Sequence, residues 1–185
     1  HKKGEADAKR SKVFSKFAQE ITIAARQSGD PASNPRLRQI LEKARELNMP
    51  TDNIERAIKR GTGEEEGVQL EEILLEAYGP GGAAILITGI TDNKNRTIGE
   101  IKQILGSHEG KLVEGGAVRW MFDQKGVVSV KTGPGTQFPS KEETELAAIE
   151  AGAQDLYWNE DTLDIFAEPS QLEDVKKKAK EKGFQ

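Results

Sequence analysis

Hydrophobic positions in the first sixty residues recur at three- and four-residue spacing, the period of helices that bury one face. The first helix, expected over residues 5–28, has an inward stripe of Val13, Phe14, Phe17, Ile21, Ala24 and Ala25. A second helix begins at Asn34-Pro35, where Asn suits the N-cap and Pro the first helical position. A third, short helix follows Pro50. The pattern predicts a three-helix N-terminal domain over residues 1–62.

The pattern changes after residues 61–70, a Gly- and Glu-rich stretch that we interpret as a linker. We expect a helix capped by Thr97 and strands over residues 73–78, 83–91 and 117–122. The first two strands are joined by Gly79-Pro80-Gly81-Gly82, in which glycine permits the positive φ of a tight turn. This segment, residues 63–125, is expected to belong to a small α/β domain.

A second α/β domain is expected over residues 126–185. Its strands are predicted at residues 127–130, 156–158 and 163–166, and its helices at 141–151 and near 172–179. Leu146 and Ile149 are expected to face inward. The order β-α-β-β-α lacks only a final strand of the ferredoxin-like arrangement. The fold class is therefore predicted as α+β, with the three-helix N-terminal domain followed by two small α/β (ferredoxin-like) domains.

Charge is distributed unevenly along the chain. The overall net charge is −4. Residues 1–60 nevertheless hold 14 Lys and Arg against 8 Asp and Glu, whereas the remainder holds 13 against 23. Such a split favours a polyanion partner for the basic part. Helices that are simply rich in Lys and Arg would explain the same split, so this alternative stays open.

Catalytic and metal-binding groups are scarce in the sequence. The chain has no Cys, which excludes a thiolate metal site. Its two His are His1, at the chain end, and His108, so only one internal His is available and no Ser-His-Asp set is apparent. The Gly79–Gly82 turn lacks the Gly-Lys-Ser/Thr of a phosphate-binding loop. No apolar run approaches the roughly 20 residues that span a bilayer. We expect no enzymatic activity, no cofactor, no metal, no small-molecule substrate and no membrane partner.

Basic residues provide the candidate binding surface. Lys9, Lys12 and Lys16 share a helical face away from the apolar stripe, where they could neutralise phosphates. Lys94 and Arg96 lie in a strand-to-helix loop, where loop capping and phosphate contact are equally good explanations. The full set of candidate nucleic-acid-binding residues is Lys2, Lys3, Lys9, Arg10, Lys12, Lys16, Arg36, Arg38, Lys43, Arg56, Lys94 and Arg96.

Several ordered motifs resemble the YebC family of gene-expression regulators. They include Asp7-Ala8-Lys9-Arg10, Asn34-Pro35-Arg36-Leu37-Arg38, Asn53-Ile54-Glu55-Arg56-Ala57-Ile58-Lys59-Arg60-Gly61, Tyr78-Gly79-Pro80-Gly81-Gly82 and Asp92-Asn93-Lys94-Asn95-Arg96. The resemblance implies a helical N-terminal domain and two α/β domains around a central cavity. It also implies a longer protein at both ends, with a further α/β segment that completes the middle domain, residues 63–125. We therefore expect either that this chain is a fragment or that its end segments are not shown.

Two roles are implied by the resemblance. Bacterial members are described as DNA-binding transcriptional regulators, while a mitochondrial relative activates translation of cytochrome c oxidase. The expected function is a translation factor that contacts ribosomal RNA through the basic helical domain. Promoter DNA binding and an acidic protein-interaction module remain alternatives. The expected location is the cytoplasm, or the mitochondrial matrix for a eukaryotic member.

Overall fold

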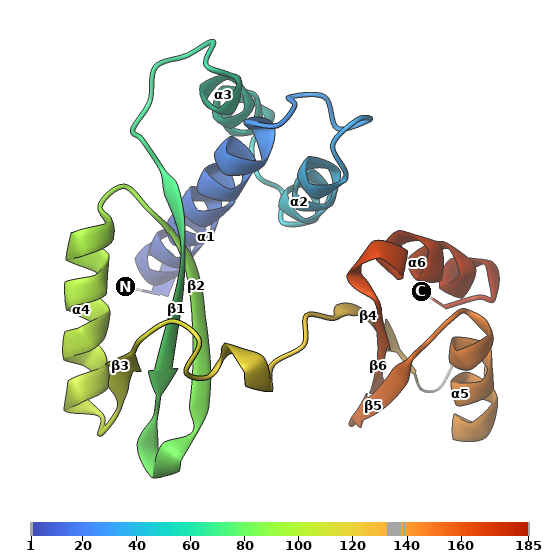
Figure 1. Ribbon diagram of the computed structural model, residues 1–185. Coiled ribbons are helices and arrows are strands. Elements are labelled where there is room, and N and C mark those ends of the chain that lie inside the picture. The colour runs from blue at the N-terminus through green and yellow to red at the C-terminus, as the bar shows by residue number, and fades with distance from the viewer. Residues whose placement is uncertain (1, 133–137, 139, 185) are drawn as a thin grey trace. The chain divides into compact units, whose positions relative to one another are not determined.

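The computed structural model describes residues 2–132, 138 and 140–184, with side chains from residue 7 onward. The chain divides into two compact units, residues 1–120 and residues 121–185 (Figure 1). Both contain helices and a small antiparallel sheet, which confirms the mixed fold class.

Three helices open the first unit. They are α1 (Lys2–Ala25), α2 (Pro35–Glu46) and α3 (Thr51–Thr62). Their shared core includes Ile21, Leu37, Leu41, Ile54 and Ala57, all buried. Helix α1 ends four residues before Gly29, where the sequence placed its end, and continues into a turn.

The buried part of α1 lies near its C-terminal end. Residues 21–25 are buried, whereas residues 7–13 are all exposed. Val13 is 41% exposed, so its expected inward position is wrong. The apolar period is correct, but α2 and α3 cover only one end of a 24-residue helix.

The sheet of the first unit has the order β2-β1-β3. Its strands are β1 (Glu71–Tyr78), β2 (Ala84–Thr91) and β3 (Lys111–Val113), and α4 (Lys94–Ser107) lies beside them (Figure 1). Strands β1 and β2 pair along eight residues, from Glu71↔Thr91 to Tyr78↔Ala84. The expected tight turn between them is a single 3₁₀ turn (Pro80–Gly82), in which Gly81 and Gly82 have φ of 68° and 79°.

The strand expected over residues 117–122 is absent. The third strand is β3 instead, and residues Arg119–Met121 form a 3₁₀ turn. The buried carboxylate of Glu76 explains the difference, because it accepts hydrogen bonds from the backbone N–H groups of Gly116, Val118 and Arg119 at 2.6, 2.7 and 2.9 Å. Donors that are held by a side chain are not available to a strand ladder.

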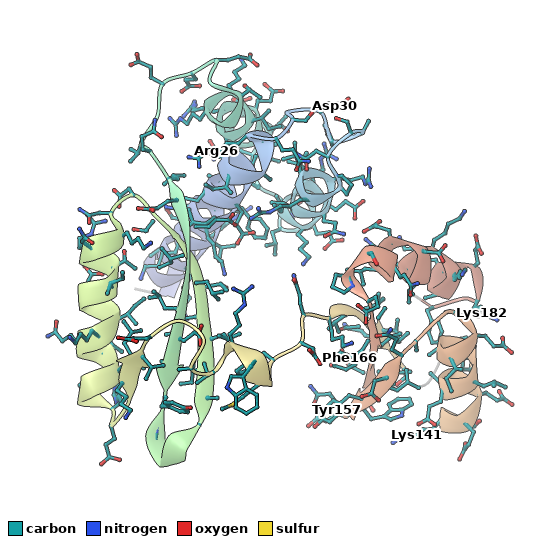
Figure 2. The ribbon with its side chains drawn as sticks, in the orientation of Figure 1. Arg26, Asp30, Lys141, Tyr157, Phe166 and Lys182 are labelled. Carbon is teal, nitrogen blue, oxygen red and sulfur yellow. The ribbon has the colours of Figure 1, made fainter. Side chains whose placement is uncertain are left out.

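The second unit has the sheet order β4-β6-β5. Its elements are β4 (Gly126–Lys131), α5 (Lys141–Glu150), β5 (Asp155–Asn159), β6 (Thr162–Ala167), a 3₁₀ turn (Pro169–Gln171) and α6 (Leu172–Glu181). Helices α5 and α6 cover one face of the sheet, and the buried core between them includes Val130, Leu163 and Ile165. Tyr157 and Phe166 lie on the sheet's other face (Figure 2).

Helix α5 faces the sheet with small side chains. Its buried residues are Thr144, Ala147 and Ala148, whereas Leu146 and Ile149 are each 57% exposed. The expectation that Leu146 and Ile149 point inward is therefore wrong. Ala147 and Ala148 are apolar as well, so the apolar residues of this short helix do not single out one face.

Candidate nucleic-acid interface

Helix α1 carries a ridge of exposed cations, Lys9, Lys12 and Lys16, which we call the lysine ridge. The three residues recur at three- and four-residue spacing and so lie on one side of the helix. Successive residues turn by about 100°, which places this side opposite the one that carries Ile21. The side chains of Lys2 and Lys3 belong to the same helix but lie outside the described residues.

Arg10 lies on a different side of α1 from the lysine ridge. Its guanidinium carbon is 5.2 Å from the centroid of the Phe14 ring, and its Nη2 donates to the Asn48 carbonyl oxygen at 3.5 Å. Together with Arg56 and Arg60 of α3, Arg10 lines a groove of about 350 Å³ between the two helices. We call this the α1–α3 groove.

Arg60 is not among the residues that the sequence predicted to bind nucleic acid. A cation in the last turn of a helix interacts favourably with the helix dipole, so Arg60 has a sufficient structural explanation when only the sequence is considered. The groove forms only because α3 packs along α1 in the tertiary structure. The signal in the sequence was the four-residue spacing of Arg56 and Arg60, which places both on one helical face.

The three candidate cations of α2 differ in their surroundings. Arg36 forms an ion pair with Glu72 at the start of β1. This hydrogen bond holds the pKa of Glu72 below its usual value and raises that of Arg36. Arg38 donates to the Pro31 carbonyl oxygen at 3.2 Å, while Lys43 is exposed in the last turn. Because Arg36 already donates to Glu72 through Nη1 and Nη2, fewer of its N–H groups are available to a phosphate.

The loop before α4 shows the capping chemistry that the sequence left open. Asn93, rather than the expected Thr97, is the N-cap, and its side chain accepts a hydrogen bond from the Arg96 backbone N–H at 3.0 Å. The Arg96 guanidinium lies 2.5 Å from an Asp92 carboxylate oxygen. Lys94 is exposed. Arg96 therefore already has a carboxylate partner, which weakens its case as a phosphate ligand.

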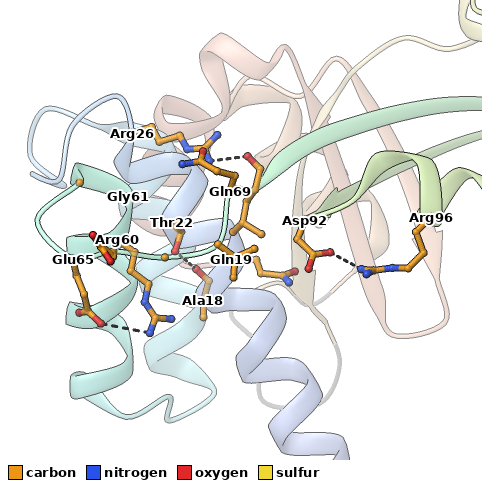
Figure 3. A pocket seen from close by; sticks show the side chains of 15 residues that line it. Ala18, Gln19, Thr22, Arg26, Arg60, Gly61, Glu65, Gln69, Asp92 and Arg96 are labelled. Carbon is orange, nitrogen blue, oxygen red and sulfur yellow. Dashed lines mark hydrogen bonds and ion pairs between the residues drawn. The ribbon is translucent and has the colours of Figure 1, made fainter.

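A larger pocket of about 910 Å³ lies within the first unit, among α1, α3, residues 63–70 and the loop before α4 (Figure 3). Its cations are paired within the pocket. Arg26 donates to the Leu70 carbonyl oxygen at 2.7 Å, Arg60 lies 3.5 Å from Glu65, and Arg96 contacts Asp92. Because carboxylates accompany the guanidinium groups, this pocket offers a polyanion less attraction than the α1–α3 groove.

The described residues show neither a metal-binding cluster nor a membrane-spanning helix. Within residues 2–132, 138 and 140–184, no group of three or more His, Cys, Asp or Glu side chains is placed to hold a metal ion. No helix in the same part of the chain has the length and apolarity that crossing a bilayer requires.

Comparison with known proteins identifies the family. Residues 1–64 match the model of the TACO1/YebC protein N-terminal domain, and residues 70–185 match that of the TACO1/YebC second and third domain. Proteins named "Probable transcriptional regulatory protein" from Petrotoga mobilis and Desulfosudis oleivorans are 50% and 52% identical to this chain. They align over 100% and 95% of this chain and 72% and 70% of their own lengths.

A solved structure agrees with these matches. The crystal structure of a conserved hypothetical protein from Aquifex aeolicus superposes with a TM-score of 0.84 and 42% sequence identity. The match covers 97% of this chain and 72% of that one. The two family models together cover nearly the whole chain, as the motifs in the sequence predicted. The chain therefore belongs to the TACO1/YebC family.

Proposed function

We propose that the protein is a non-enzymatic gene-expression factor that associates with nucleic acid through its helical segment, residues 1–62, with ribosomal RNA as the target. The lysine ridge is the observation that carries this proposal. Lys9, Lys12 and Lys16 are exposed on the side of α1 opposite the core, so they can approach phosphates without disturbing the packing. Such contacts release counterions and require no particular base sequence.

The exposed side of α3 favours RNA over sequence-specific DNA reading. A helix that reads the major groove presents Arg, Asn or Gln to the base edges. Helix α3 has only twelve residues, and its exposed side chains include the carboxylates of Asp52 and Glu55. These would lie near DNA phosphates if the helix entered a groove. Phosphate contact to a folded RNA places no such demand on α3.

A DNA-binding transcriptional regulator is the second candidate. The observation in its favour is that many relatives, including those from Petrotoga mobilis and Desulfosudis oleivorans, are named probable transcriptional regulatory proteins. The lysine ridge would serve this function equally well, because duplex DNA and RNA share the phosphate backbone. The two candidate functions are therefore distinguished by whether the protein binds ribosomes or promoter DNA.

Ribosome co-sedimentation at several salt concentrations tests the proposal. The variant K9E/K12E/K16E is compared with the wild type, and K102E/K111E/K131E serves as the control, because it makes the same charge change at three exposed lysines elsewhere. The ridge variant is expected to leave the ribosomal fraction. Its log–log salt slope should fall by about 2, since each lost contact to a single strand removes about 0.7. The control should co-sediment like the wild type.

Two results would contradict the proposal. If the wild type stays in the supernatant at low salt but shifts a promoter duplex specifically, the transcriptional candidate replaces it. If the ridge variant co-sediments with an unchanged salt slope, the lysine ridge is not the contact, and the ribosome is bound through another surface of the chain.

A further inference from the structure

Three arginines line the α1–α3 groove, on the side of α1 away from the lysine ridge. Arg10 comes from α1, and Arg56 and Arg60 come from α3, one helical turn apart. We propose that this groove binds the phosphate backbone of a single nucleic-acid strand. The proposal rests on the nucleic-acid association proposed above and assigns it a second surface with its own residues.

Charge favours an anionic occupant. Among the groove residues whose side chains the structure describes, from residue 7 onward, Asp7 is the one carboxylate that accompanies the three arginines. Arg56 has no carboxylate within ion-pair distance among the described residues, and it is exposed. An arginine fork donates two parallel hydrogen bonds to a phosphate, which makes it a better phosphate ligand than a point charge.

Arg10 is already held in place at the groove. Its guanidinium lies over the Phe14 ring and reaches the Asn48 carbonyl oxygen. A cation over an aromatic face is attracted by the negative face of the ring. A ligand therefore meets an arginine that has already lost part of its rotamer freedom, which lowers the entropic cost of binding.

The width of the groove favours one strand over a duplex. Helices α1 and α3 pack directly on each other, and the axes of such helices lie roughly 8–10 Å apart. The groove of about 350 Å³ is too small to enclose a duplex, whereas the backbone of one strand can lie in it. Arg10 covers the Phe14 ring, so stacking of bases on that ring is not expected. Binding should accordingly depend on phosphates and tolerate any base sequence.

Glu65 competes with the ligand for one of the arginines. Its Oε1 lies 3.5 Å from Nη2 of Arg60, and both side chains are about two-fifths exposed. An exposed pair at this distance is weak. A phosphate can therefore take Arg60 from Glu65 at little cost, and removing the carboxylate should tighten binding.

The test measures binding of a fluorescein-labelled 20-nucleotide oligouridylate by fluorescence anisotropy over a range of salt concentrations. The variant R56Q/R60Q is compared with R45Q/K59Q, which removes two exposed cations of α2 and α3 that do not line the groove. The groove variant should lose about 1.4 from the log–log salt slope, because two contacts are lost. The control should lose less than about half of that. E65Q should bind about twofold more tightly.

Thermal melts by circular dichroism establish that the variants are folded, and R56K/R60K should restore most of the salt slope because it restores both charges. An unchanged slope in R56Q/R60Q, together with lost binding in K9E/K12E/K16E, overturns the groove and leaves the proposed function standing. A wild type that binds neither the oligonucleotide nor ribosomes overturns both. Equal competition by a duplex of the same length overturns the single-strand assignment. Equal competition by polyglutamate overturns the nucleic-acid assignment.

Discussion

Replacing Asn34, which links the first two helices, should lower the free energy of unfolding more than any substitution at the surface of residues 1–62. The side chain is 1% exposed and makes three hydrogen bonds. Its Nδ2 donates to the carbonyl oxygens of Ala24 and Ser28, each at 2.8 Å, and its Oδ1 accepts from the Leu37 backbone N–H at 3.0 Å. One amide therefore caps α2 and also donates to two backbone carbonyl groups at and just after the end of α1.

The expected cost of Asn34→Ala follows from these three bonds. Loss of an N-cap costs about 1 kcal/mol. Each of the two carbonyl oxygens loses a partner, which costs about 1 kcal/mol more per bond. The free energy of unfolding should fall by about 3 kcal/mol, which corresponds to roughly 10 °C in the melting temperature of a unit of this size. Asn34→Ser keeps the capping oxygen but removes both donors, so it should cost about 2 kcal/mol.

Urea unfolding followed by circular dichroism, together with scanning calorimetry, measures these differences. Asn95→Ala is the matched control, because Asn95 is exposed in the first turn of α4, and its change should stay within about 0.5 kcal/mol. Equal losses in Asn34→Ala and Asn95→Ala would refute the assignment of the three bonds. Equal losses in Asn34→Ala and Asn34→Ser would show that the cap contributes nothing.

Two further predictions concern the sheets of the two units. The hydrogen bond from the Gly116 backbone N–H, followed by those from Val118 and Arg119, lowers the pKa of Glu76 below its ordinary 4.5. Its stabilisation is therefore complete above that pH and is lost as the pH falls through the lowered pKa. Glu76→Gln should accordingly melt below the wild type above about pH 5, with a gap that narrows in acid, and a pH-independent gap in calorimetry would contradict this. In the second unit, Leu163→Ala should cost about 3 kcal/mol because Leu163 is fully buried, whereas Leu146→Ala should cost less than about 1 kcal/mol; similar losses in urea unfolding would contradict the observed face of α5.

Most features that depend on neighbours in the sequence were predicted correctly, although the N-cap of α4 is Asn93 and not Thr97. Asn34 and Pro35 start α2 as expected, because a cap and its N–H donor lie three residues apart. The β1–β2 hairpin and its turn also follow from local signals, since the glycines that adopt positive φ lie between two apolar runs. The lysine ridge was predicted to be exposed because its spacing places it away from the apolar stripe, and its three lysines are exposed. Local geometry determines all of these.

Features that depend on distant partners were decided by the tertiary structure. The strand expected at residues 117–122 was replaced because Glu76, some forty residues earlier, holds the backbone N–H groups there. Leu146 and Ile149 are exposed because the sheet contacts the small residues of α5, and the sequence of the helix does not choose that face. Arg60 lines the α1–α3 groove only because α3 packs along α1. By itself the sequence determined the helices, the hairpin and the exposed lysines, since these rest on spacings of a few residues. Burial, the Glu76 clamp and the α1–α3 groove needed the tertiary structure, because each is made by groups that only folding brings together.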